Sequence, residues 1–248
     1  PMYGLVIAFK NYKPARGIWG SKWVGFTWFE TFFKDPYFFR LLRNTFRLSA
    51  YSILFGFPAP IILALMLNEV RSQRYKKLIQ TVSYLPHFLS MVIVVGMAQN
   101  IFSSNGVVNN LLVSLGLVDQ PVFWLGEGKY FWGLVGVINI WKEVGWQSII
   151  YLAAIAGIST ELYEAASIDG ASRLRIIRHI IIPELMSVMS IQFILQLGGI
   201  LNAGFDQIFN MMNGAVRETV EIIDTYIYNI SFEAKPDYGF SGAIGIFK

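Results

Sequence analysis

The sequence predicts an all-α protein whose helices cross a membrane several times, and three observations lead to this fold class. Hydrophobic residues make up 54% of the 248 residues and charged residues only 15%, below the roughly 25% usual in soluble domains. Four long segments are nearly free of charge, and positive charges gather in loops between them. This composition excludes a disordered chain, a nucleic-acid binder and an ordinary soluble enzyme. The absence of cysteine excludes a disulfide framework and thiolate metal sites.

Each of the four segments reaches about the 20 apolar residues that a helix needs to cross a bilayer. Lys142 and Glu143 interrupt the segment 130–160, and the other three segments contain no Asp, Glu, Lys or Arg. The apolar stretches 2–9 and 239–247 are shorter, and we expect each to be part of a truncated span. The sequence thus predicts a polytopic helical bundle of six spans in the intact protein, with four complete spans at 48–67, 78–102, 130–160 and 185–205.

The orientation of the bundle is predicted from its loops. Segment 68–77 carries four positive charges, and short basic loops of this kind stay on the cytoplasmic side. Counting spans from there places 161–184 inside, where its three arginines agree with the rule. The same count places segments 103–129 and 206–238 outside.

Segment 10–45 does not fit this orientation, because it would lie outside and yet holds seven positive charges. It is also rich in aromatic residues, which are typical of a helix lying in the membrane interface. We therefore keep it outside and divide the chain into two parts. Residues 1–40 would hold the end of the first span and this extracytoplasmic, aromatic-rich segment, and residues 41–248 would form the membrane domain.

The loop at 161–184 contains the most informative motif. Local propensities predict a short helix over 161–168 and an amphipathic helix over 171–182. Asp169 and Gly170 between them form a strong turn signal, because glycine readily adopts positive φ. In the second helix, Leu174, Ile177 and Ile181 are expected to share one apolar face, and Pro183 to end it or begin the next span. A loop of this kind can dock into a groove on a partner protein.

This loop resembles the EAA loop of binding-protein-dependent ABC importer permeases. The family pattern is E-A-A, two residues, D-G-A, five residues, F, two residues, I, two residues, P, and only its phenylalanine differs here, as Ile177. The matching residues are Glu164, Ala165, Ala166, Asp169, Gly170, Ala171, Ile180 and Pro183. The resemblance implies a type I ABC transmembrane domain over 41–248, with 161–184 as its cytoplasmic coupling loop.

The resemblance extends over nearly the whole chain. Residues 67–69, 84–86 and 106–109 resemble carbohydrate-uptake permeases of the maltose-permease group. Residues 10–12, 17–20 and 197–213 look like the subgroup that carries polysaccharides and complex oligosaccharides.

This resemblance implies a set of partners as well. They are a second, homologous permease, two cytoplasmic ATPases, an extracytoplasmic solute-binding protein and a sugar, with no nucleic acid. It places the protein in the cytoplasmic membrane of a prokaryote. In such permeases the helix before the motif's glycine sits in a cleft of the ATPase, so Glu164 would pair with a basic ATPase residue. ATP and Mg²⁺ would be used by the ATPases, and this chain would bind no cofactor and no metal and would catalyse no reaction; its sequence contains no nucleotide-binding GxxxxGK[ST] motif.

A path for the substrate is predicted from polar residues inside the spans, because such groups are costly there and are functional candidates by default. Amides and carboxylates can bind sugar hydroxyls, and flat aromatic rings can cover the apolar faces of pyranose rings. Gln147 is a further polar residue near the middle of the third span. The predicted path residues are Asn139, Trp141, Glu143, Trp146, Gln196, Asn202, Asp206 and Gln207.

Several alternatives stay open. Lys142 and Glu143 could pair with the partner subunit rather than face the substrate. The same importer class could carry a peptide or an amino acid. A secondary transporter driven by an ion gradient would show an inverted repeat and broken helices, and the sequence reveals neither. An intramembrane enzyme using Glu143, Asp206 or His87 would be active without an ATPase.

Overall fold

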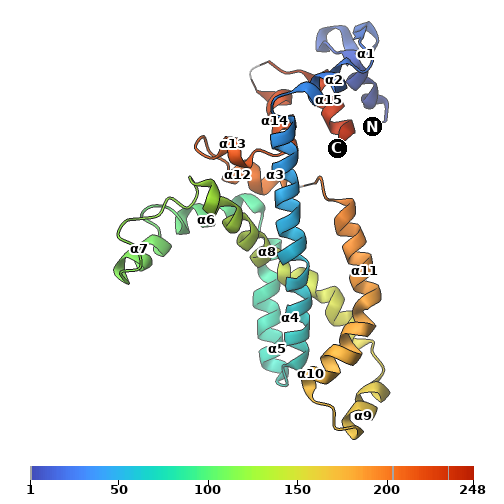
Figure 1. Cartoon of the computed structure of the whole chain (residues 1–248), viewed down its shortest axis with the longest axis vertical. Helices are drawn as coiled ribbons and strands as arrows, with labels where there is room; N and C mark the ends of the chain where they lie inside the picture. Colours follow the sequence, from blue (N-terminus) through green and yellow to red (C-terminus); the bar gives the residue numbers. More distant parts are fainter. Residues whose placement is uncertain (1, 203, 234) are drawn as a thin grey trace. The chain divides into compact units, whose positions relative to one another are not determined.

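The computed structural model describes residues 2–202, 204–233 and 235–248 (Figure 1). Ala203, which belongs to the predicted fourth span and to the stretch similar to polysaccharide permeases, lies outside these residues. The chain divides into two compact units built from discontinuous segments. Unit 1 comprises Pro1–Ser49, Ile101–Trp132 and Ile200–Lys248, and unit 2 comprises Ala50–Asn100 and Gly133–Gly199.

The first complete span is a helix over Phe38–Glu69, 32 residues long. Its parts are α3 (Phe38–Tyr51), a π-helical turn η3 (Ser52–Gly56) and α4 (Pro58–Glu69). The prediction of a span at 48–67 is confirmed, but the helix begins ten residues earlier. The boundary proposed after residue 40 therefore falls inside a continuous helix rather than in a loop.

The second predicted span is not one straight helix. The segment formed by α5 (Gln73–Tyr84) and the 3₁₀ turn η4 (Leu85–Phe88) is bent by 103° relative to α6 (Met91–Ile101). Proline lacks the N–H that a helix interior requires, and Pro86 occupies the start of η4, after which Leu89 is extended. The sequence revealed no sign of this break, which the structure shows.

The third span is α8 (Gly128–Ala156), and the fourth is a helix over Arg173–Gly198. A bend of 70° separates α8 from α9 (Thr160–Ile168). The fourth span ends at Gly198 rather than at residue 205. The span consists of α10 (Arg173–Ile176), a π-helical turn η5 (Ile177–Ile181) and α11 (Ile182–Gly198). Pro183 lies in the first turn of α11, which agrees with the expectation that it begins the next span, although the helix is continuous through it.

Unit 1 packs around an aromatic core in which Phe32 and Phe38 are buried with Leu41, Ile223 and Ile244. The aromatic segment is therefore partly a core element, although other rings such as Phe26 stay exposed. In the described residues, the strands are limited to one two-residue antiparallel pair. The elements of this unit, besides part of α3 and the beginning of α8, are η1 (Met2–Phe9), β1 (Lys10–Asn11), η2 (Pro14–Arg16), α1 (Gly17–Gly20), β2 (Lys22–Trp23), α2 (Thr27–Lys34), α7 (Val107–Ser114), α12 (Phe205–Met211), α13 (Arg217–Val220), α14 (Ile223–Phe232) and α15 (Tyr238–Phe247).

Some of the positive charges in segment 10–45 have partners inside unit 1. Arg40 pairs with the buried Glu221 at 3.3 Å and lies over the Tyr37 ring. Lys10 is buried and donates to the backbone oxygen of Ile18 (2.7 Å). Because these charges are neutralised or satisfied by the fold, they count less as orientation signals than free loop lysines do.

Candidate functional site

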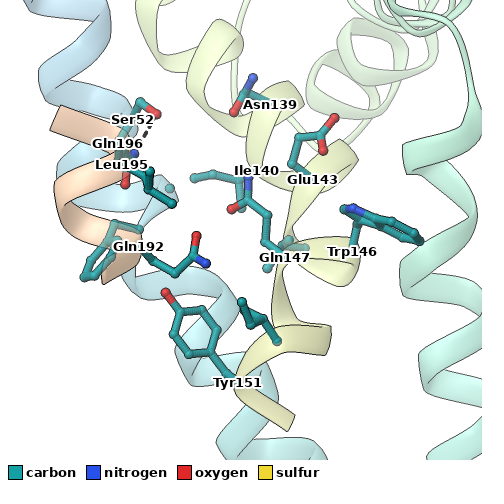
Figure 2. A pocket seen from close by; sticks show the side chains of 14 residues that line it. Ser52, Asn139, Ile140, Glu143, Trp146, Gln147, Tyr151, Gln192, Leu195 and Gln196 are labelled. Atoms are coloured by element: carbon teal, nitrogen blue, oxygen red, sulfur yellow. Dashed lines mark hydrogen bonds between the residues drawn. The ribbon is translucent and has the colours of Figure 1, made fainter. Parts of the chain in front are cut away.

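A cavity of about 450 Å³ lies within unit 2, between α8, α11 and the π-helical turn η3 (Figure 2). Its walls carry many groups that can form hydrogen bonds, together with three aromatic rings. The polar side chains are those of Ser52, Asn139, Glu143, Gln147, Gln192 and Gln196, and the aromatic ones are those of Phe57, Trp146 and Tyr151.

Helical periodicity explains why the polar residues of α8 and α11 line one cavity. Residues four apart lie on the same face of a helix, and Asn139, Glu143 and Gln147 follow this spacing on α8. Gln192 and Gln196 follow it on α11. Figure 2 shows the Gln147 and Gln192 side chains reaching into the space between these two helices.

The third wall is formed by the π-helical turn. Gln196 Nε2 donates to the backbone oxygen and to Oγ of Ser52, at 3.1 Å each. The same Ser52 oxygen also accepts from Phe57 N (3.0 Å). A carbonyl group inside a bilayer must find its partners within the protein. Gln196 therefore joins α11 to η3 and lines the cavity at the same time.

Glu143 belongs to an ion cluster at the edge of the cavity. Lys142 Nζ donates to Glu143 Oε1 (2.8 Å) and to the backbone oxygen of His87 (2.9 Å). His87 Nδ1 lies 2.7 Å from Glu143 Oε2. The Lys142 side chain is only 10% exposed, so this pairing compensates for the cost of burying its charge. Both charged residues thus find partners within the chain.

Trp146 lies beside this cluster and also lines the cavity. Its ring is stacked on the imidazole of His87, with centroids 4.5 Å apart and an interplanar angle of 1°. The edge-to-face ring of Phe88 contacts it at 5.6 Å. In Figure 2, Trp146 lies on the side of α8 opposite to Ser52 and Gln196, so it borders the cavity at its edge.

The structure brings together four of the predicted path residues, because Asn139, Glu143, Trp146 and Gln196 line this cavity. It does not bring the other four there. Trp141 is 46% exposed and lies outside the lining. In unit 1, Asn202 and Asp206 are exposed and Gln207 is buried. These four stay sequence predictions.

Among the polar and aromatic lining residues, four were missed in the sequence analysis, namely Ser52, Phe57, Tyr151 and Gln192. The four-residue spacing between Gln192 and Gln196 was a signal that could have identified the first of these amides. Ser52 and Tyr151 carried no such signal, because serine and tyrosine are common in membrane helices. Only the packing of η3 against α11 places Ser52 at the cavity.

The coupling loop is a separate candidate site, at the end of unit 2 where α9 and α10 meet. Helix α9 ends in a Schellman motif: Ala171 N donates to the Ala166 oxygen (2.9 Å) and Gly170 N to the Ser167 oxygen (3.1 Å). Gly170 has a φ of +66°, a conformation that other residues adopt only with strain. The predicted turn at Asp169 and Gly170 is confirmed.

The motif residues divide into a packed and an exposed set. Ala166 and Ala171 pack against the core cluster around Ile176 and Leu185. Glu164, Ala165, Asp169 and Pro183 are exposed. Ile168 is 86% exposed, so its apolar side chain is accessible to a partner protein.

One expectation for this loop is wrong. Leu174 does not share the buried face with Ile181, because it is 75% exposed and Ile176 is buried instead. The π-helical turn η5 explains the difference, since a wider turn shifts the phase of the helix by about one residue. Side chains before and after the turn therefore do not keep the α-helical spacing.

The coupling loop and the basic loop at 68–77 lie at the same end of unit 2 (Figure 1). Burial raises the pKa of Tyr163 in α9, and the nearby carboxylate of Glu69 at the end of α4 raises it further. An effect of Glu69 on Tyr163 requires the two loops to be close. Their placement on one side of the membrane, predicted from charge, agrees with this proximity.

The chain is similar to known membrane transport proteins. Residues 56–245 match the family described as "Binding-protein-dependent transport system inner membrane component". Protein LplB of Bacillus subtilis (strain 168) is 45% identical over 249 residues, covering 100% of this chain and 77% of LplB. The polygalacturonan/rhamnogalacturonan transport system permease protein YteP of the same organism is 43% identical, with the same coverage.

A solved structure is also similar. A chain from the crystal structure of a bacterial ABC transporter involved in the import of the acidic polysaccharide alginate superposes with a TM-score of 0.91. The two chains are 43% identical, and the match covers 100% of this chain and 82% of the other. The match spans both the cavity-lining helices and the coupling loop. The chain therefore belongs to the inner membrane components of binding-protein-dependent ABC importers.

Proposed function

We propose that this chain is the permease subunit through which an oligosaccharide enters the cell by alternating access. The observation that carries this proposal is the cavity of about 450 Å³ lined by amides, a hydroxyl, a carboxylate and aromatic rings. Such groups bind sugar hydroxyls and the apolar faces of sugar rings. The names of the relatives, which refer to polygalacturonan, rhamnogalacturonan and alginate, support a carbohydrate rather than a peptide or an amino acid.

The energy would come from other subunits. We infer that two cytoplasmic ATPases hydrolyse ATP with Mg²⁺, and that this chain binds neither. The exposed residues Glu164, Ala165 and Ile168 of α9 would dock into an ATPase cleft. A second, homologous permease would complete the translocation path, and a binding protein would deliver the sugar from outside. Coupling works because the two states of the ATPase dimer contact the loop differently.

Uptake in proteoliposomes tests this function. The full-length protein is reconstituted with its partner permease, ATPase and binding protein, and the import of labelled oligosaccharides and of a control peptide is measured with and without ATP. We expect import of an oligosaccharide that depends on ATP. Import of the peptide alone would change the substrate class, and import driven by an ion gradient without ATP would overturn the proposal.

A matched pair of variants assigns the substrate to the cavity. Gln192→Leu replaces an amide that lines the cavity with an apolar group of similar size, so uptake should fall about tenfold. Met186→Leu changes an exposed residue of the same helix and should leave uptake unchanged. Equal uptake by both variants would remove Gln192 from the path.

A further inference from the structure

Residues 83–88, which lead into the bend between η4 and α6, contact helix α8 at several points. A Cβ atom at Gly145 would clash with the backbone carbonyl group of Ser83, so glycine is required for this approach. Two residues of α8, one on each side of Glu143, also contact this segment. Lys142 donates to the backbone oxygen of His87, and Trp146 stacks on its imidazole ring. His87 is thus the point where the bend and the cavity wall meet.

The hydrogen bonds define the state of the His87 ring. Oε1 of Glu143 accepts a hydrogen bond from Lys142, and Oε2 lies within hydrogen-bond distance of Nδ1 of His87. A carboxylate can only accept hydrogen bonds, so Nδ1 of His87 must carry the proton and donate it. This bond fixes the rotation of the imidazole ring about its side-chain bonds. The plane of the ring, parallel to that of Trp146, is therefore set by Glu143.

The stacked ring leaves Trp146 with one aromatic face available. His87 covers one face of Trp146, and Phe88 meets it edge to face. The tryptophan nevertheless stays 44% exposed and lines the cavity. A side chain held on one side and open on the other is well suited to stack on a flat ligand, because its rotation has already been restricted before the ligand arrives.

We propose that His87 is a positioning residue for substrate binding: it holds the Trp146 ring and the Glu143 carboxylate in the orientation in which they meet a sugar ring. The inference rests on the proposed function of the cavity. His87 itself is not part of the cavity lining, and it acts through its two neighbours. Its contribution is to the affinity for the sugar rather than to the ATPase cycle.

Two substitutions separate the two contacts of His87. His87→Phe keeps an aromatic ring against Trp146 and loses the N–H donated to Glu143. His87→Gln keeps an N–H donor and loses the ring. Because Glu143 also has Lys142 as a partner, the stack on Trp146 is the principal contact of His87. The KM for sugar uptake should therefore rise about tenfold in His87→Ala and in His87→Gln, and only about twofold in His87→Phe. The maximal uptake rate and the ATPase rate should change less than twofold in all three.

A double-mutant cycle provides a readout that a merely structural role would not move. In a Trp146→Ala background, His87→Ala should raise the KM no further, because the ring that it positions is absent. Leu85→Ala is the matched control, since Leu85 belongs to the same 3₁₀ turn and is exposed. It should leave the KM unchanged. Should His87→Ala fail to assemble, His87→Phe and His87→Gln in the two backgrounds still give the comparison.

Three outcomes would overturn the proposal: an unchanged KM in His87→Gln, an equal rise in His87→Phe and His87→Gln, or additive effects of His87 and Trp146. The proposed function is tested separately by the wild-type complex. If the wild type takes up no oligosaccharide with ATP, the function fails. If it does so and the His87 variants behave as the wild type, only the positioning role fails.

Discussion

The coupling loop and the cavity, both in unit 2, differ in how far apart in the chain their residues lie. The Schellman motif of the loop joins residues 166–171, and its hydrogen bonds span five residues at most. The cavity joins η3, α8 and α11, and Gln196 bonds a residue 144 positions away. Local structure follows from nearby residues, whereas a cavity exists only after distant helices have packed. The loop should therefore be sensitive to backbone geometry and the cavity to helix packing.

The largest expected effect concerns the backbone of the loop. Gly170→Val forces a β-branched residue into a φ of +66°, at a cost of about 1–2 kcal/mol or more. Because the turn would then change shape, ATP-dependent uptake should be abolished while the affinity for the binding protein stays intact. Gly133→Ala in α8, where the added Cβ meets none of the described residues within 4 Å, is the control. Normal uptake by Gly170→Val would contradict the coupling role.

The second effect concerns helix packing at the cavity. Gly145→Val would place its side chain against the Ser83 backbone, so α8 must move away from α5 and η4. We expect a thermal midpoint lowered by several degrees and a poor yield of assembled complex. Gly133→Val introduces the same side chain in open space of the same helix and should have little effect. Equal stability of the two variants would show that the close approach at Gly145 is dispensable.

The third effect concerns the ion cluster. Lys142→Met keeps the length of the side chain but removes its charge, which leaves the carboxylate of Glu143 and the backbone oxygen of His87 short of a donor. Loss of one partner from a largely buried pair should cost about 1–3 kcal/mol. A thermal-shift assay in detergent compares this variant with Lys129→Met, whose lysine belongs to an exposed pair. A larger loss in Lys129→Met would be contrary to the burial argument.

The fourth effect tests the phase shift introduced by η5. Ile176→Ala removes a buried side chain and should cost about 2–4 kcal/mol. Leu174→Ala removes an exposed one and should change stability by less than about 0.5 kcal/mol. The two residues are separated by a single position, so the comparison measures the register directly. The reverse order would indicate regular α-helical spacing and no π-helical turn.

The smallest effect is a pH dependence in the coupling loop. Burial and Glu69 raise the pKa of Tyr163, so folding favours its neutral phenol. The resulting stabilisation is present below the ordinary tyrosine pKa of about 10 and is lost as the pH rises through the raised value. The absorbance at 295 nm of the wild type minus that of Tyr163→Phe should titrate above pH 10. A midpoint at or below that pH would place Tyr163 in water.

Much of the fold was predictable because membrane helices depend on apolar length, which the sequence displays directly. The spans at 48–67 and 130–160 were identified in this way. The bend near Pro86 was not, because a proline inside a membrane helix is compatible with a straight or a bent helix. The burial of Phe32 and Phe38 in the aromatic segment was not anticipated either, since aromatic residues suit both a membrane interface and a protein core.

The candidate sites divide in the same manner. In the coupling loop, the turn at Asp169 and Gly170 was predicted correctly because it is local, although the face of Leu174 was not. For the cavity, the polar residues of α8 were identified from their cost inside a membrane. Their neighbours Ser52 and Tyr151 became visible only in the structure, and so did the stacking of His87 on Trp146.

The sequence by itself determined the all-α membrane fold, the family and the turn at Gly170, because these depend on composition and on residues close together in the chain. Only the tertiary structure decided which polar side chains share a cavity, where the second span bends, and what His87 holds. These features depend on distances between segments up to 144 positions apart. Such distances are set by how helices pack, and packing is a property of the folded chain rather than of any one segment.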